Sequence, residues 1–197
     1  MPIICKNIIS EHIENTLDAI NQTRSDSDLL LAVEEAGNIS VAALRNNKKI
    51  MFAGNGGSAA DAQHLAAELV SRLNYDRPGL AGIALTTDTS ALTAIGNDYG
   101  FDYIFARQIE AIGQEGDVFF ALSTSGNSPN ILSAIEAARK KNIKIVGMSG
   151  ESGGKMVQLC DIIIKIPSHK TPHIQECHIM LGHIICQIIE DSIFKIL

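Results

Sequence analysis

Two side chains one helical turn apart are candidates for chemistry. His64 and Glu68 occupy positions i and i+4 of a segment with helical spacing. This spacing places both on one helix face, within reach of one metal ion or one substrate. Near the end of the chain, Gln175 and His183 lie about two helical turns apart and can face the same side. Each pair, taken alone, is also compatible with an exposed helix face or a hydrogen-bonded core histidine.

The four other histidines have no comparable partner along the sequence. We expect structural or solvated roles for them: His12, His169, His173 and His178.

A run of hydroxyl side chains precedes Pro129, and its members are Ser123, Thr124, Ser125 and Ser128. Proline suits the first turn of a helix, and Ser128 suits the N-cap position before it. Hydroxyls beside the free N–H groups of a helix N-terminus form a receptor for a phosphate monoester. The run contains no lysine or arginine, which suits a small sugar phosphate held by neutral donors. A capped solvent loop would explain Ser128 but not the whole run.

A glycine-rich turn, Gly54-Asn55-Gly56-Gly57-Ser58, precedes the helix that carries His64. Glycines let the backbone approach a ligand closely and adopt positive φ angles. The turn lacks the Lys-Ser/Thr of a Walker loop and the spacing of a dinucleotide-binding loop, so nucleotide binding is poorly supported. A tight strand-to-helix turn without a ligand explains this motif equally well.

Short apolar runs that alternate with helical segments predict the order of elements. The predicted strands are 49–53, 82–86, 117–122, 144–148 and 162–166. The predicted helices between and after them are 59–73, 90–95 with 103–112, 129–141, 155–159 and 174–197. Strands that are apolar throughout indicate a parallel sheet covered on both faces. The fold class is therefore α/β in one domain, with ligands expected beyond the carboxyl ends of the strands.

The two ends of the chain are apolar. Helical spacing relates Ile9, Ile13, Leu17 and Ile20, and the acidic stretch 25–28 offers N-caps for a second helix before the first strand. The predicted C-terminal helix is apolar nearly all round, so most of its sides should be buried. Association of subunits through the N-terminal helices, about 1–47, and the C-terminal helix, about 174–197, would bury both.

The overall composition narrows the class of protein. Apolar residues make up 46% of the 197 residues, and the net charge is −6, which argues against a nucleic-acid platform. The four cysteines show no paired metal-ligand spacing and are interpreted as reduced core residues. Charged residues interrupt the N-terminal apolar positions, and the tract 179–189 is short for a bilayer span. We expect a cytoplasmic protein with no membrane or nucleic-acid partner.

Three segments together resemble the sugar isomerase (SIS) domain family: GNGGSAADAQHLAAEL from Gly54, STSGNSPN from Ser123, and IPSHKTPHIQECH from Ile166 with the following Gly182-His183. The resemblance spans nearly the whole chain and is closest to members that isomerise sedoheptulose 7-phosphate. It implies a single SIS domain over 1–197. The implied fold is a flavodoxin-like sandwich, with a five-stranded parallel sheet flanked by helices. It also implies a homotetramer with active sites at subunit interfaces.

The resemblance also assigns roles to individual residues. It implies one Zn²⁺ per subunit, with Glu68 and His183 also acting as general base and acid. The implied zinc ligands are His64, Glu68, Gln175 and His183. The implied substrate-binding residues are Asn55, Gly56, Gly57, Glu68, Asn97, Asp98, Ser123, Thr124, Ser125, Ser128 and Gln175.

The implied reaction converts sedoheptulose 7-phosphate to D-glycero-D-manno-heptose 7-phosphate through an enediol. It is the first step of ADP-heptose biosynthesis for lipopolysaccharide or capsule. Three alternatives stay open: a non-catalytic relative that associates with the replication initiator, a sugar-phosphate sensor of the regulator type, and an isomerase of another sugar phosphate. The non-catalytic relative lacks a glutamate and a histidine at the positions of Glu68 and His183, which favours an enzyme. The sensor usually carries an added DNA-binding domain, for which this acidic chain has no room.

Overall fold

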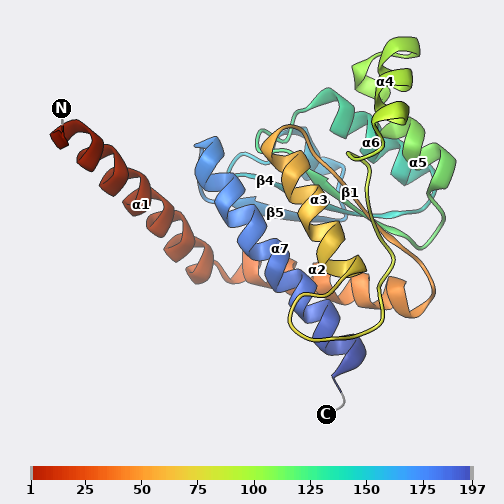
Figure 1. Cartoon of the computed structure of the whole chain (residues 1–197), viewed down its shortest axis with the longest axis horizontal. Helices are drawn as coiled ribbons and strands as arrows, with labels where there is room; N and C mark the ends of the chain where they lie inside the picture. Colours follow the sequence, from red (N-terminus) through yellow and green to blue (C-terminus); the bar gives the residue numbers. More distant parts are fainter. Residues whose placement is uncertain (1, 196–197) are drawn as a thin grey trace.

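The centre of the fold is a sheet of five parallel strands in the order β2-β1-β3-β4-β5. The computed structural model describes residues 2–195, with side chains from residue 7 onward, and is shown in Figure 1. The strands are β1 (Ile50–Ala53), β2 (Gly82–Ala84), β3 (Val118–Leu122), β4 (Lys144–Gly150) and β5 (Ile162–Ile166). All four pairings are parallel, so the predicted α/β class and five-stranded parallel sheet are confirmed.

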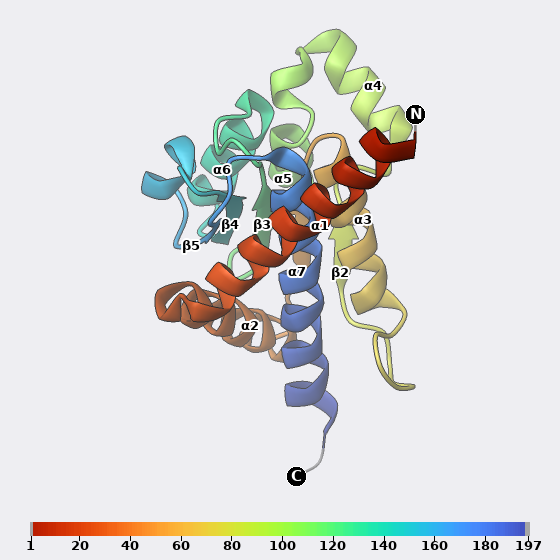
Figure 2. The ribbon, with the colours of Figure 1, turned by 90° about the vertical axis from the view of Figure 1, so that its left-hand side faces the viewer.

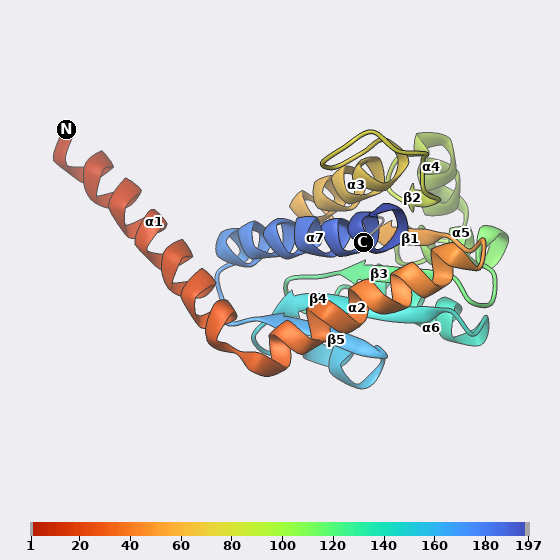
Figure 3. The ribbon, with the colours of Figure 1, turned by 90° about the horizontal axis from the view of Figure 1, so that it is seen from below.

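Helices cover both faces of this sheet. They are α1 (Pro2–Ser25), α2 (Ser27–Arg45), α3 (Gly57–Val70), α4 (Thr89–Asp98), α5 (Ala106–Ile112), α6 (Pro129–Lys140) and α7 (Thr171–Phe194), with short 3-10 helices η1 (Phe101–Tyr103) and η2 (Gly154–Gln158). On one face, α2, α3 and α7 share an apolar core with alternate strand residues such as Phe52 and Phe120. On the other face, α5 and α6 share a core with Met51 and Phe119. Figures 1 and 3 show α7 lying beside α3 on the same side of the sheet.

Burial along the strands follows their place in the sheet. Every residue of β1 and β3 is buried, as expected for central strands covered on both faces. Exposure partly alternates in the edge strand β5, where Lys165 is exposed between buried Ile164 and Ile166. The sequence interpretation of apolar strands throughout therefore holds for the centre of the sheet and not for this edge.

Several predicted boundaries were wrong by a few residues. The helix predicted at 59–73 spans Gly57–Val70, and the segment predicted as a helix at 155–159 forms η2. Asp26 caps α2 as expected, because its carboxylate accepts from the N–H groups of Asp28 and Leu29. Ser128 stands at the N-cap of α6, but its hydroxyl does not cap the helix. It contacts Ser123 Oγ at 2.9 Å instead.

The two terminal helices differ in their packing. By length and hydropathy α7 could cross a membrane, but it packs against α2, α3 and β4 and buries Leu181, Ile185 and Ile189. It is therefore a core helix of this domain. Helix α1 projects away from the sheet and crosses the N-terminal part of α7 (Figures 2 and 3). Its apolar residues Ile9 and Ile13 are more than half exposed.

Candidate active site

Two loops meet where the order of the strands reverses. Strands β1 and β3 are neighbours, yet β1 leads to α3 on one face of the sheet and β3 leads to α6 on the other. In doubly wound sheets such a switch point opens a crevice at the carboxyl ends of the strands. Across it, Asn55 and Asn130 donate amide N–H groups to each other's carbonyl oxygen at 2.9 and 2.8 Å. This reciprocal pair holds the glycine-rich loop beside the start of α6.

Glycine is required twice in the loop after β1. Gly56 has a φ of 55°, in the left-handed region that favours glycine. A Cβ at Gly57 would lie 2.6 Å from Nε2 and 2.7 Å from Oε1 of Gln175, so no larger residue fits without displacing that amide. Gln175 Nε2 also lies 3.5 Å from Ser58 Oγ. The glycines therefore bring Gln175 of α7 against the first turn of α3.

The hydroxyl run after β3 forms a compact loop. Ser123 is buried and its Oγ lies 2.9 Å from Ser128 Oγ and 3.5 Å from Ser125 Oγ. Within residues 2–195, the backbone N–H groups of Thr124, Ser125 and Ser128 donate to no protein acceptor. Three hydroxyls that converge beside free N–H groups form an anion receptor without a charged side chain. The predicted phosphate loop has the geometry for this role.

The side chains of His64, Glu68 and His183 converge between α3 and α7. The Nε2 atom of His64 lies 2.8 Å from Nε2 of His183 and 3.2 Å from a carboxylate oxygen of Glu68. These ligand atoms lie within 4.8 Å of one another, so the residues could hold a metal ion. A bound ion at about 2.0–2.1 Å from each atom requires the ligand atoms to be close together in this way. Nitrogen and carboxylate donors fit a zinc-class ion, and the 48% exposure of the His64 side chain leaves the group accessible.

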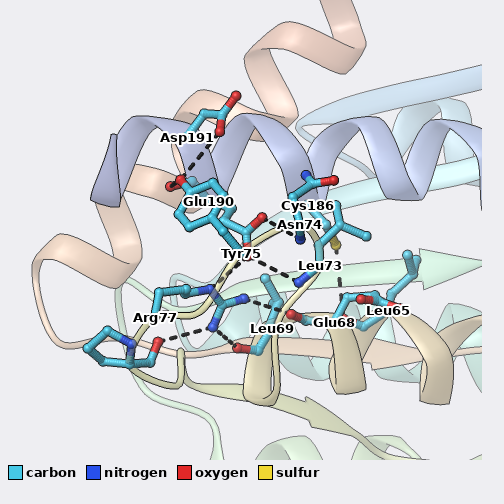
Figure 4. Close-up of polar contacts among 11 residues, drawn as sticks. Leu65, Glu68, Leu69, Leu73, Asn74, Tyr75, Arg77, Cys186, Glu190 and Asp191 are labelled. Carbon is cyan, nitrogen blue, oxygen red and sulfur yellow. Dashed lines mark hydrogen bonds and ion pairs between the residues drawn. The ribbon is translucent and has the colours of Figure 1, made fainter. Parts of the chain in front are cut away.

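A buried ion pair ties the end of α3 to α7 (Figure 4). Arg77 lies in the segment that follows α3, and its guanidinium donates to the carboxylate of Glu190 on α7 at 3.0 Å. The same guanidinium donates to the backbone oxygens of Glu68 and Leu69, both at 2.7 Å. Arg77 thereby satisfies carbonyl groups that the last turn of α3 leaves free.

The carboxylate of Glu190 completes this brace by accepting the backbone N–H groups of Leu73 and Asn74 at 3.1 and 2.9 Å. Both charged side chains are almost fully buried. The helix that carries His64 and Glu68 is therefore tied to the helix that carries His183.

One further carboxyl group lies near the metal-binding group. Burial raises the pKa of Asp61 to about 6, although the nearby His64 lowers it in part. One of its carboxylate oxygens is buried with no hydrogen-bond partner among the described residues. Asp61 was not among the residues singled out from the sequence, because nothing in its spacing distinguishes it from other helix residues.

Four more residues were predicted to bind the substrate or the metal, and they lie in different parts of the structure. Asn97 and Asp98 are exposed at the end of α4. The side-chain amide of Asn97 donates a hydrogen bond to the carboxylate of Asp98 at 2.8 Å. Gln175 contacts Ser58 and Gly57, and no hydrogen bond within residues 2–195 joins it to His64, Glu68 or His183. Thr124 is half-buried beside the three serines.

The structure shows the contacts of the four histidines for which structural or solvated roles were expected. His12 and His173 meet at Glu176, and His169 contacts Glu151 at 2.7 Å. His178 is buried, and its Nε2 lies 3.2 Å from the backbone oxygen of Ser149. Spacing along the chain gave no signal for His12, because its partners are more than 160 residues away.

Comparison with known proteins places the chain in a family. The sequence pattern of the SIS domain matches residues 10–150, and the chain belongs to the SIS domain family. It is 52% identical over 187 residues to the phosphoheptose isomerase of Aneurinibacillus thermoaerophilus, covering 95% of this chain and 94% of that protein.

Two solved structures have the same fold over nearly their whole length. The phosphoheptose isomerase of Neisseria gonorrhoeae is 41% identical, with a TM-score of 0.89 over 96% of this chain and 100% of that one. The phosphoheptose isomerase of Francisella tularensis is 37% identical, with a TM-score of 0.91 over 95% of this chain and 98% of that one. The resemblance inferred from three sequence segments is confirmed.

Proposed function

We propose that this chain is an aldose–ketose isomerase that converts sedoheptulose 7-phosphate to D-glycero-D-manno-heptose 7-phosphate. One observation carries the proposal. A phosphate-type loop follows β3 at the switch point, and the helix that starts there after β1 carries His64 and Glu68, in a chain about half identical to phosphoheptose isomerases over nearly its full length. The relatives carry isomerase names, which favours an enzyme over the non-catalytic alternative. The reaction would supply heptose phosphate for ADP-heptose.

Substrate binding is assigned to the two loops. The hydroxyls of Ser123, Ser125 and Ser128 and the free N–H groups beside them would hold the 7-phosphate. The glycine-rich loop would let the sugar approach the backbone closely, with Asn55 and Gln175 as polar contacts. Asn97 and Asp98 are exposed within one chain, and we assign them to the sugar as well.

Proton transfer is assigned to Glu68 and His183. In the ketose, a base takes a proton from C1 while an acid gives a proton to O2, which forms the enediol. The base then returns a proton to C2, and the proton on O1 passes to the conjugate base of the acid, which leaves an aldehyde at C1. Glu68 is suited to the carbon-bound proton and His183 to the oxygens. Such a pair contributes about 10²–10⁴-fold to the rate.

The metal-binding group is assigned to a zinc ion, one at this position in each subunit. His64, Glu68 and His183 would hold it, with Gln175 as the fourth predicted ligand. When bound, such an ion supplies positive charge that stabilises a substrate oxyanion. His183 Nε2 has one lone pair, so it cannot hold an ion and donate a proton at the same moment. An assay with the metal removed therefore distinguishes the role of His183 as a zinc ligand from its role as a proton donor.

We also propose a cytoplasmic homotetramer. Apolar side chains on α1 are exposed in one chain, among them Ile9, Ile13 and Leu17 at more than 50%. Such a contiguous face is typical of a protein contact. Light scattering at micromolar concentration should give the mass of four chains, and a monomer mass would contradict this assembly.

The function is tested with purified protein and sedoheptulose 7-phosphate, with and without added zinc. We expect the aldose phosphate to form and a Glu68→Gln variant to bind substrate but convert it poorly. Protein that binds the ketose phosphate but never converts it would contradict the proposal. Conversion of another ketose phosphate in preference would change the substrate but keep the reaction.

A further inference from the structure

A second group of metal-binding side chains lies where α1 crosses α7. Its members are His12 on α1 and His173 and Glu176 on α7. His12 Nε2 lies 2.8 Å from one carboxylate oxygen of Glu176, and His173 Nδ1 lies 3.2 Å from the other. The three ligand atoms lie within 4.8 Å of one another. This group shares no residue with His64, Glu68 and His183.

The donor set and its surroundings suit a zinc-class ion. Two imidazole nitrogens and a carboxylate are typical zinc ligands, whereas magnesium and calcium prefer oxygen donors alone. The imidazole of His173 is 4% exposed, while His12 and Glu176 are 46% and 39% exposed. The group is therefore anchored on the buried side and open to water on the other. A pocket lined by Asn15, Asp18 and His169 reaches His173 from the same junction.

Thr16 provides the supporting contact that metal ligands usually have. Its Oγ lies 2.6 Å from Glu176 Oε2 and 2.8 Å from His173 Nδ1. Without an ion, the hydroxyl donates to the carboxylate and His173 donates to the hydroxyl, so the group would be a hydrogen-bonded clamp. With an ion, Nδ1 of His173 loses its proton to the solvent and offers its lone pair. The Thr16 hydroxyl still donates to Glu176 and orients it.

We propose that His12, His173 and Glu176 bind a second zinc-class divalent ion, which joins α1 to α7. Helix α1 makes its main contacts with α7 and α2, and it leaves the rest of the fold at a steep angle (Figure 3). An ion at this crossing fixes the direction of α1 and so the position of its exposed apolar residues. The ion is structural and takes no part in the isomerisation.

The test counts ions in four versions of the full-length protein. Each is stripped with a chelator, titrated with Zn²⁺, dialysed and analysed for bound zinc per chain. The versions are the wild type, His12→Asn, His64→Ala and the double variant, and we expect two, one, one and no ions respectively. Because His64→Ala removes the first site, zinc bound to this variant reports on the second site alone. The result does not depend on whether the first site has a catalytic role.

Two controls separate an ion from a clamp. His169→Asn alters an exposed histidine outside the group and should leave the number of ions unchanged. Cobalt in place of zinc should give a visible d–d absorption in His64→Ala that is absent from the double variant, which also carries His12→Asn. If His64→Ala binds no zinc and shows no cobalt band while His12→Asn keeps the full wild-type number, the group is a hydrogen-bonded clamp and the proposal is wrong.

Discussion

The two His/Glu groups each consist of two histidines and one glutamate, and they differ in what surrounds them. His64 and Glu68 are neighbours on α3, which starts at the glycine-rich loop, and the Arg77–Glu190 brace ties that helix to α7. The group at His12 joins α7 to α1, a helix that projects from the fold (Figures 1 and 2), and none of its three side chains belongs to either loop. A set of potential ligands thus becomes a candidate active site only where loops can present a substrate. We expect the first group to serve chemistry and the second to serve structure.

The largest expected effect comes from the brace. Arg77→Ala would leave the buried carboxylate of Glu190 without its cation, which typically costs about 3–5 kcal/mol. Denaturant unfolding at one fixed protein concentration measures the loss, because assembly makes apparent stability depend on concentration. Arg107→Ala breaks an ion pair whose side chains are about half exposed and should cost less than about 1 kcal/mol. Equal losses of unfolding free energy in Arg77→Ala and Arg107→Ala would show that burial does not determine how much the Arg77–Glu190 pair stabilises the fold.

The next effect concerns the base. Glu68→Gln keeps the size of the side chain but removes the basic oxygen, so isomerisation should fall by about 10²-fold or more. Substrate binding should change much less, because the phosphate loop is intact. Single-turnover rates and calorimetric binding measure the two separately. Full activity in this variant would place the base elsewhere and leave the isomerase reaction standing.

A smaller effect is expected in the phosphate loop. Ser123→Ala removes a hydroxyl from the anion receptor and should weaken binding of sedoheptulose 7-phosphate by about tenfold, the scale of one hydrogen bond to a charged group. Calorimetry should show little change for unphosphorylated sedoheptulose, which we expect to bind weakly to the wild type as well. Ser192→Ala, an exposed serine in the last turns of α7, is the matched control. Equal affinity of the wild type for phosphorylated and free sugar would contradict the proposal that this loop binds the phosphate group.

The smallest effect on catalysis is expected at the second group. His12→Asn should change kcat and KM by less than about twofold, since no assigned step uses this residue. The coupled assay is run at a protein concentration where light scattering shows the wild-type mass. A fall in isomerisation rate as large as that of Glu68→Gln, with the mass unchanged, would contradict the assignment of the first group to catalysis and the second to structure.

The parts of the site that follow from local spacing could be predicted from the sequence. Apolar runs predicted the strands, and the i, i+4 pair placed His64 and Glu68 on one face. Ser128 was placed correctly before α6, but its hydroxyl faces Ser123 because the loop folds back on itself.

The parts that depend on long-range contacts could not be predicted. Arg77 and Glu190 are separated by 113 residues, and Asn55 and Asn130 by 75. His12 and Glu176 are 164 residues apart, and their meeting depends on the angle at which α1 crosses α7. Periodicity specifies which face of a helix is apolar, but not which polar side chains two helices bring together. For this reason the brace, and the meeting of His12 with the neighbouring pair His173 and Glu176, emerged only from the structure.

The most direct test of the account is isomerisation of sedoheptulose 7-phosphate in D₂O, followed by NMR. We predict that the wild type forms D-glycero-D-manno-heptose 7-phosphate with deuterium at C2, because the carbon-bound proton passes through a base that exchanges with solvent. His12→Asn should give the same product at a similar rate, and Glu68→Gln should give about 10²-fold less. Wild-type protein that binds the ketose phosphate yet forms no aldose, with or without zinc, would contradict the account.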